Sequence, residues 1–215
     1  MSIPDGVYLL SSAAETVISR LIRFGTGGEH GHLSIVFLQD GQLRAYSFAR
    51  RRWSTPLDGA FVEEGRERYT FGGGRCSSLA LFSLPGEVQR RARRRLARLR
   101  PELENCLYNL PDAVANSVGL RVRSRVAHTC VSYCALVLGL DGRRRAVSLC
   151  QVLHAVGAQM VYRGSLAGLE RFAGARFWEG DSDFYSERLG KTEAVMTVLG
   201  SQGRSLARIA REWLG

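Results

Sequence analysis

The sequence predicts an α+β fold in which an antiparallel sheet packs against one buried helix. Residues 33–38 (LSIVFL) have strong strand composition, and Asp40-Gly41 is a hairpin turn signal before a return strand over 43–48. Residues 126–140 (VAHTCVSYCALVLGL) have the apolar length and spacing of a buried helix that begins near Thr129. A hydrophobic fraction of 45% in 215 residues is ordinary for a globular protein and sufficient for a sizeable core.

Further strands extend the predicted sheet on both sides of the hairpin. Residues 6–10 (GVYLL) predict a short buried strand, and Ser11-Ser12 predicts the start of a helix that ends at the glycine cluster over 25–28. The other expected strands lie, in chain order, within 56–65 and over 68–71, 76–84 and 159–162.

Three more helical segments are expected. Pro85 begins a helix that reaches about Leu103, with an apolar stripe on one side and arginine over the rest. A short helix covers 146–156, and the C-terminal tail is helical but broken near 200–203. Residues 105–119 predict an irregular or weakly helical linker.

The charge of the chain favours an acidic partner. Thirty Lys and Arg residues against twenty Asp and Glu residues give a net charge of +10, and the helix over 85–103 carries many of the arginines. Nucleic acid, an anionic membrane surface and an anionic substrate are candidates, while a merely solvated basic surface is the simpler alternative. No apolar run reaches the roughly 18 residues that a transmembrane helix needs.

The cysteines predict reduced thiols in the cytoplasm. They are odd in number and show no paired spacing, and the N-terminal residues carry acids without a basic leader, so no secretory signal is expected. The chain has no CxxC pair and no HxxxH pair, so neither a metal site nor a cofactor is expected.

Cys130 is the candidate nucleophile. It would lie in the first turn of the predicted helix, where unpaired N–H groups and the positive end of the helix dipole favour a thiolate and could stabilise an oxyanion. The alternative is a small buried thiol without chemistry, because free cysteine is among the most buried residues.

A cysteine nucleophile needs a histidine base and a polar group that orients it. His32 is favoured as the base, because it stands at the start of the 33–38 strand. His30 lies further out in the preceding loop, His128 lies just outside the helix start, and His154 falls in a later helix.

Several segments together carry a family resemblance: GVYLL (6–10), ISRLIRFGTGGEHGHLSIVF (18–37), AYSF (45–48), GAFVEE (59–64), Tyr108-Asn109, HTCVSYCALVLGL (128–140) and MVYRGSL (160–166). In order and spacing, over roughly residues 5–168, the chain resembles the circularly permuted papain-like amidases, the NlpC-related group that includes lecithin retinol acyltransferase. In that permuted order the histidine precedes the cysteine, as His32 precedes Cys130.

The resemblance implies a permuted papain-like catalytic domain over 1–170, with residues 171–215 as a C-terminal helical extension packed on it. Cys130 would be the nucleophile and His32 the base. Tyr108 could add a hydroxyl to the oxyanion site. The family's pattern has an aromatic residue and a serine where this chain has His128 and Val131.

The third polar residue of the family lies on the strand after the histidine strand. Ser47 is favoured by its strand parity with His32 and by the AYSF match, with Tyr46 and Arg44 as alternatives at neighbouring positions. Glu63 or Glu64 could substitute for it if the next strand folds over the site.

The expected activity is therefore thiol-mediated hydrolysis or acyl transfer on an amide or ester, with peptides, isopeptides, acyl-lipids and small amides all open as substrates. One alternative is a basic protein that binds nucleic acid or an anionic membrane through its arginine-rich helix. Another is a degenerate papain-like fold without turnover.

Overall fold

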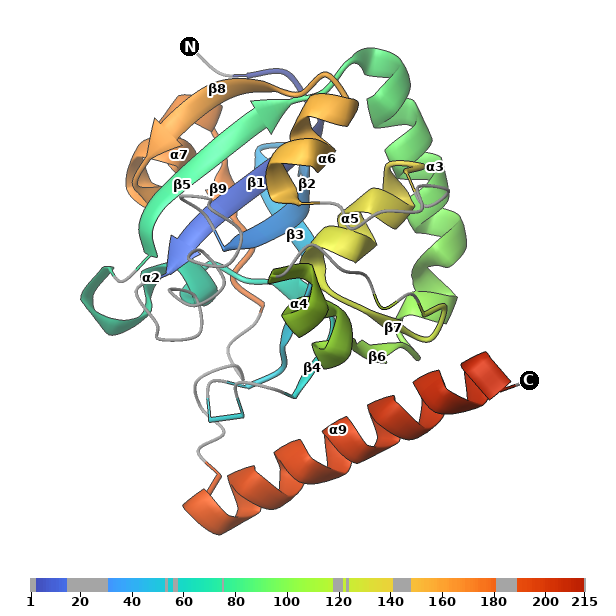
Figure 1. Cartoon of the computed structure of the whole chain (residues 1–215). Helices are drawn as coiled ribbons and strands as arrows, with labels where there is room; N and C mark the ends of the chain where they lie inside the picture. Colours follow the sequence, from blue (N-terminus) through green and yellow to red (C-terminus); the bar gives the residue numbers. More distant parts are fainter. Residues whose placement is uncertain are drawn as a thin grey trace.

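A mostly antiparallel sheet forms the centre of the molecule in the computed structural model (Figure 1). The structure describes residues 3–14, 31–52, 54–55, 58–74, 76–117, 122, 124–140, 148–180 and 189–214. Within them the sheet runs in the order β4-β3-β2-β1-β5-β8, so the α+β prediction is confirmed. The strands are β1 (Gly6–Ala14), β2 (His32–Gln39), β3 (Gln42–Arg50), β4 (Gly59–Glu64), β5 (Cys76–Ser83) and β8 (Gln159–Gly164).

Three short strands complete the pairing. Strand β9 (Arg176–Phe177) runs parallel to the start of β3, while β6 (Leu107–Tyr108) and β7 (Ala127–His128) form a separate parallel pair. The hairpin between β2 and β3 turns at Asp40 and Gly41, whose φ angles are 52° and 73°. Positive φ at both turn residues matches the twist of the strands, as the Asp-Gly signal predicts.

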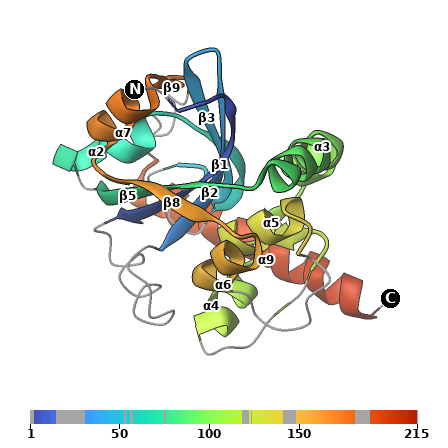
Figure 2. The same ribbon diagram turned by 90° about the horizontal axis from the view of Figure 1, so that it is seen from above.

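Helices cover both faces of the sheet (Figure 2). One face packs against α3 (Gly86–Leu103), α5 (Cys130–Val137) and α6 (Leu149–Ala155); the other packs against α2 (Glu67–Gly74) and α7 (Leu166–Ala173). Side chains of β1 alternate between the two faces of the sheet. Val7 and Leu9 pack in the core with α3, α5 and α6, and Tyr8 and Leu10 pack in the core with α2 and α7. This double burial explains why residues 7–10 of the strand (VYLL) are apolar or aromatic at every position.

The predicted arginine-rich helix corresponds to α3. Its apolar stripe is buried through Val88, Ala92, Leu96 and Leu103, while most of its arginines are exposed. The basic surface is therefore present, and its binding to an acidic partner stays a prediction. None of the helices that the structure describes is long and apolar enough to span a membrane.

Three expected features are wrong. Ser11 and Ser12 continue β1 instead of starting a helix, because both pair with β2 and β5 on either side. Residues 68–71 lie in α2, not in a strand. The C-terminal tail forms one unbroken helix, α9 (Lys191–Leu214), through Gly200 and Gly203. The rest of that predicted helix, from residue 15 to the glycine cluster over 25–28, lies outside the described residues.

Helix α9 runs along one side of the molecule, near α4 (Leu110–Ser117), β6 and β7 (Figure 1). Its inner side carries Ser201 and Ser205, both buried, and Ser205 donates a hydrogen bond to the carbonyl of Tyr108. Near its end, Glu212 accepts hydrogen bonds from the backbone N–H of Arg125 and the hydroxyl of Ser124. The expected domain boundary at residue 170 falls inside α7 and is not otherwise tested.

Candidate active site

Cys130 is the first residue of α5. Thr129 is the N-cap, and its side chain accepts a hydrogen bond from the N–H of Ser132, while the Ser132 hydroxyl accepts one from the N–H of Thr129. The N–H groups of Cys130 and Val131 have no protein acceptor among the residues that the structure describes. The helix therefore begins where the sequence predicts, with two free donors beside the sulfur.

The Cys130 thiol lies against the start of β2. It forms a side-chain hydrogen bond with His32 and receives a backbone hydrogen bond from Leu33. Burial on its own raises the pKa of Cys130, since only 9% of the residue is exposed, but these two contacts outweigh burial and leave the pKa below its ordinary value. A lowered pKa is what a thiolate nucleophile requires.

His32 is held on its other side by Glu64. The Nε2 atom of His32 lies 2.7 Å from Oε1 of Glu64, and 24% of the imidazole is exposed. Burial lowers the pKa of His32, but the Glu64 carboxylate and the Cys130 sulfur raise it to about 10. The imidazole is therefore kept as an imidazolium between a carboxylate and a sulfur.

Glu64, the last residue of β4, is fully engaged by hydrogen-bond donors. Besides His32, its carboxylate accepts from Ser47 at 2.9 Å, from Tyr69 at 2.6 Å and from Ser34 at 2.5 Å. Burial raises the pKa of this carboxyl, but the charges of His32 and Arg68 and the Ser34 hydroxyl hold it well below its usual range. Glu64 thus stays ionised in a place where only 2% of it is exposed.

Strand register explains how these residues meet. Val36 pairs with Ala45, and Ala45 pairs with Glu64, so these three side chains share one face of the sheet. Since side chains alternate, His32 and Ser47 lie on that face as well. His32 is the first residue of β2, so it lies at the end of that central strand, within reach of the start of α5.

The parity argument for Ser47 is therefore correct, but its hydroxyl bonds to Glu64 and not to the imidazole. Glu64, which the sequence kept as an alternative, contacts His32 at 2.7 Å, and the Ser34 hydroxyl oxygen also lies 3.2 Å from Nε2 of the imidazole. Glu63 and Arg44, two other candidates, form an ion pair with each other at 3.1 Å. Tyr46 is in the opposite core, stacked on Phe61.

Of the remaining histidines, the structure describes His128 and His154. His128 is buried, with its ring 5.3 Å from that of Phe48, and lines a cavity of about 560 Å³ together with Ser132. His154 is exposed on α6. His30 lies outside the described residues.

Tyr108 lies close to the nucleophile. Burial and the nearby Cys130 sulfur both raise the pKa of its hydroxyl well above the usual value. Its ring packs on Gly59 of β4, where a Cβ atom would lie 2.8 Å from the ring. Glycine at 59 is thus what lets Tyr108 lie against the sheet.

Sequence reasoning missed Ser34 and Tyr69. Ser34 could have been found by the same parity that selected Ser47, since it is two residues after His32 on the same strand. Tyr69 could not have been identified by strand parity, because its segment has the composition of a strand but folds as α2.

The comparisons with known proteins add no relative. No protein-family model matches the chain, and no curated protein matches its sequence. Among the residues described, no group of three or more His, Cys, Asp or Glu side chains is arranged to hold a metal ion.

Proposed function

We propose that the protein is a cysteine hydrolase or acyltransferase with a permuted papain-like fold, acting on an amide or ester bond. One observation carries the proposal: the imidazole of His32 is held between the buried carboxylate of Glu64 and the sulfur of Cys130 at a helix start. Nucleophile, base and orienting group, each within hydrogen-bond reach of the next, are the parts that thiol catalysis requires.

In the first half of the reaction, the Cys130 thiol proton resides on His32. The thiolate forms a bond to the substrate carbonyl carbon, and the carbonyl π electrons move onto oxygen. The free N–H groups of Cys130 and Val131, together with the Tyr108 hydroxyl, stabilise this negative charge. As the carbonyl re-forms, the bond to the leaving amine or alkoxide breaks, and His32 gives that group its proton.

In the second half, neutral His32 accepts a proton from water or from an acceptor alcohol or amine. The resulting oxygen or nitrogen nucleophile attacks the thioester carbonyl, and the bond to sulfur breaks to regenerate the Cys130 thiolate. Water gives hydrolysis, and another acceptor gives acyl transfer. Peptides and acyl-lipids both offer the required carbonyl.

Glu64 and Ser47 are positioning residues in this scheme. Glu64 fixes the orientation of the ring and stabilises its charged form, as a carboxylate does for an imidazolium. Ser47, Ser34 and Tyr69 hold the carboxylate still by occupying its lone pairs.

The test is alkylation of the full chain with iodoacetamide between pH 5 and pH 10, followed by mass analysis of each cysteine peptide. Cys130 is expected to react with an apparent pKa well below the roughly 8.5 of free cysteine, and p-nitrophenyl acetate is expected to acetylate the same residue. His32→Ala should remove both effects.

Two other cysteines serve as controls in the same sample. Cys134 lies one turn further along α5, and burial raises its pKa well above the ordinary value, so it should stay unlabelled. Cys150 is exposed and reports the alkylator's activity. Labelling of Cys130 as slow as that of Cys134 would contradict the proposal and favour a degenerate fold or a basic binding protein.

A further inference from the structure

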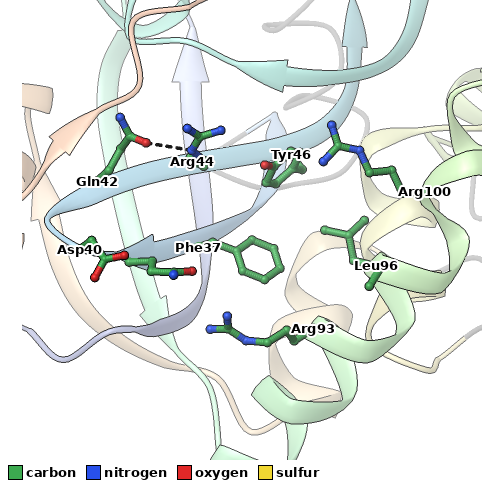
Figure 3. A pocket seen from close by; sticks show the side chains of 10 residues that line it. Phe37, Asp40, Gln42, Arg44, Tyr46, Arg93, Leu96 and Arg100 are labelled. Carbon is green, nitrogen blue, oxygen red and sulfur yellow. Dashed lines mark hydrogen bonds between the residues drawn. The ribbon is translucent and has the colours of Figure 1, made fainter.

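A second cavity, of about 590 Å³, lies between the β2–β3 hairpin and α3 (Figure 3). Its volume is in the range of small-molecule sites. Phe37, at its centre, is five residues along β2 from His32, which corresponds to about 17 Å of extended strand. The cavity is therefore separate from the candidate active site.

The floor of this cavity is apolar and aromatic. Phe37 projects from β2 toward α3 and lies near Leu96 (Figure 3). The rings of Phe37 and Tyr46 meet edge to face, with 5.7 Å between their centroids. Such a floor favours an apolar body over a bare ion.

The rim of the cavity is cationic. The guanidinium carbon of Arg93 lies 5.4 Å from the Phe37 centroid, and that of Arg100 lies 5.6 Å from the Tyr46 centroid. A guanidinium over the face of a ring keeps the N–H groups at its edge available for a carboxylate or a phosphate.

These arginines differ in their existing partners. Arg100 pairs with Glu104 at 3.0 Å, and Arg44, across the cavity, pairs with Glu63 at 3.1 Å. For Arg93, no carboxylate partner is found in the part of the chain that the structure describes. Arg93 is thus the cation best able to accept an anion from outside.

We infer that this cavity binds an anionic amphiphile. A carboxylate or phosphate group would bind Arg93, and the apolar body would cover Phe37 and Leu96. Asp40, at the hairpin end, disfavours the anion there and so fixes the direction of the ligand. The inference does not depend on the proposed chemistry of Cys130.

Calorimetric titration of the full chain at low salt tests it, with decanoate, decyl phosphate and inorganic phosphate as the probes, each below any micelle-forming concentration. Saturable binding of either decyl compound is expected, and the tighter of the two identifies the head group. Inorganic phosphate should bind at least about tenfold more weakly, because it lacks the apolar body.

Two variants and a control locate the binding. Arg93→Gln should weaken the affinity about tenfold by removing a charged hydrogen-bond donor, and Ala97→Phe should abolish binding by filling the cavity from α3. Arg94→Gln, at the exposed position next to Arg93 on the same helix, should leave the affinity unchanged. Absent binding, equal binding of inorganic phosphate, or an equal loss in Arg94→Gln would overturn the inference, provided that thermal melts show every variant folded.

Discussion

Glu64 is the residue on which the site depends most. A carboxylate that is 2% exposed is costly to ionise unless donors and cations compensate for the lost water. Here three hydroxyl groups and an imidazole supply that compensation. The network therefore explains both the ionised carboxylate and the orientation of His32.

Replacing Glu64 by Gln removes a charge that itself raises the pKa of Cys130, but it also removes the partner that keeps His32 charged. Because His32 lowers the Cys130 pKa more than Glu64 raises it, we expect a net rise in the pKa of Cys130. We expect the rate of Cys130 alkylation at pH 7 to fall at least about tenfold, which corresponds to one pKa unit. Glu63→Gln is the matched control, since Glu63 is the preceding residue on the same strand and pairs with Arg44. An equal effect of both substitutions would count against the role of Glu64.

The Glu64–His32 pair should make folding stability depend on pH, with losses at both low and high pH. The lowered pKa of Glu64 contributes stability above about pH 4.5, the ordinary pKa of a glutamate, and this stability is lost as the pH falls further. The raised pKa of His32 contributes stability below about pH 6.5, which is lost as the pH rises through about 10. In urea unfolding, the free energy of unfolding of the wild type should therefore exceed that of Glu64→Gln by the largest amount between pH 4.5 and 6.5. A difference that does not change with pH would contradict this.

Two buried tyrosines should respond oppositely to loss of their hydroxyl groups. Tyr69→Phe removes a donor to the Glu64 carboxylate and should cost about 1.5–3 kcal/mol of unfolding free energy. The Tyr133 hydroxyl has no hydrogen-bond partner within the described residues, so Tyr133→Phe should leave stability unchanged or raise it by about 1 kcal/mol. Denaturant melts of the two variants give the comparison.

At the level of single elements, α5 and α6 offer a matched pair of helix starts. Both have a capping box, with Thr129 and Ser132 on α5 and with Ser148 and Gln151 on α6. Thr129→Ala and Ser148→Ala should each cost about 1 kcal/mol of unfolding free energy. Only Thr129→Ala should also slow Cys130 alkylation, because only that cap fixes the position of the sulfur; an equal slowing in Ser148→Ala would indicate a general effect of destabilisation.

Elements with strong local signals could be predicted from sequence. Asp40-Gly41 demands positive φ, Thr129 followed by an apolar run marks a helix start, and Pro85 cannot continue a strand but can begin a helix. Ser11-Ser12 misled because a serine pair before small residues resembles a helix cap, whereas pairing on both sides makes it a central strand. Gly200 and Gly203 led to the wrong prediction of a break, because α9 continues through both glycines despite their low helix propensity.

At the scale of the whole molecule, the site depends on strand pairing that no local signal encodes. The catalytic roles of Cys130 and His32 stay predictions, but their positions, at a helix start and at a strand start, were predictable from the sequence. The choice of Glu64 over Ser47 was not, because it depends on β4 pairing beside β3 in one particular register. Both candidates were present in the prediction, and the register determines which of them contacts the imidazole.

Helix α9 is tied to the segment that leads into the nucleophile. Glu212 bonds to Ser124 and to the N–H of Arg125, and the Ser124 hydroxyl in turn accepts from the N–H groups of Val126 and Ala127. Glu212→Gln should therefore speed hydrogen exchange at Arg125 and Val126, as measured by mass spectrometry, with little change in global stability. Glu193→Gln, at the exposed beginning of α9, should leave that exchange unchanged.

The hairpin turn at Asp40 and Gly41 lies at the far end of β2 from His32, about 26 Å away along an extended strand. A spectroscopic label attached at this turn would therefore sit beside the arginine-rimmed cavity while leaving the thiol undisturbed. Such a labelled protein could report occupancy of one location and reactivity at the other in a single sample, and so would reveal whether the two communicate.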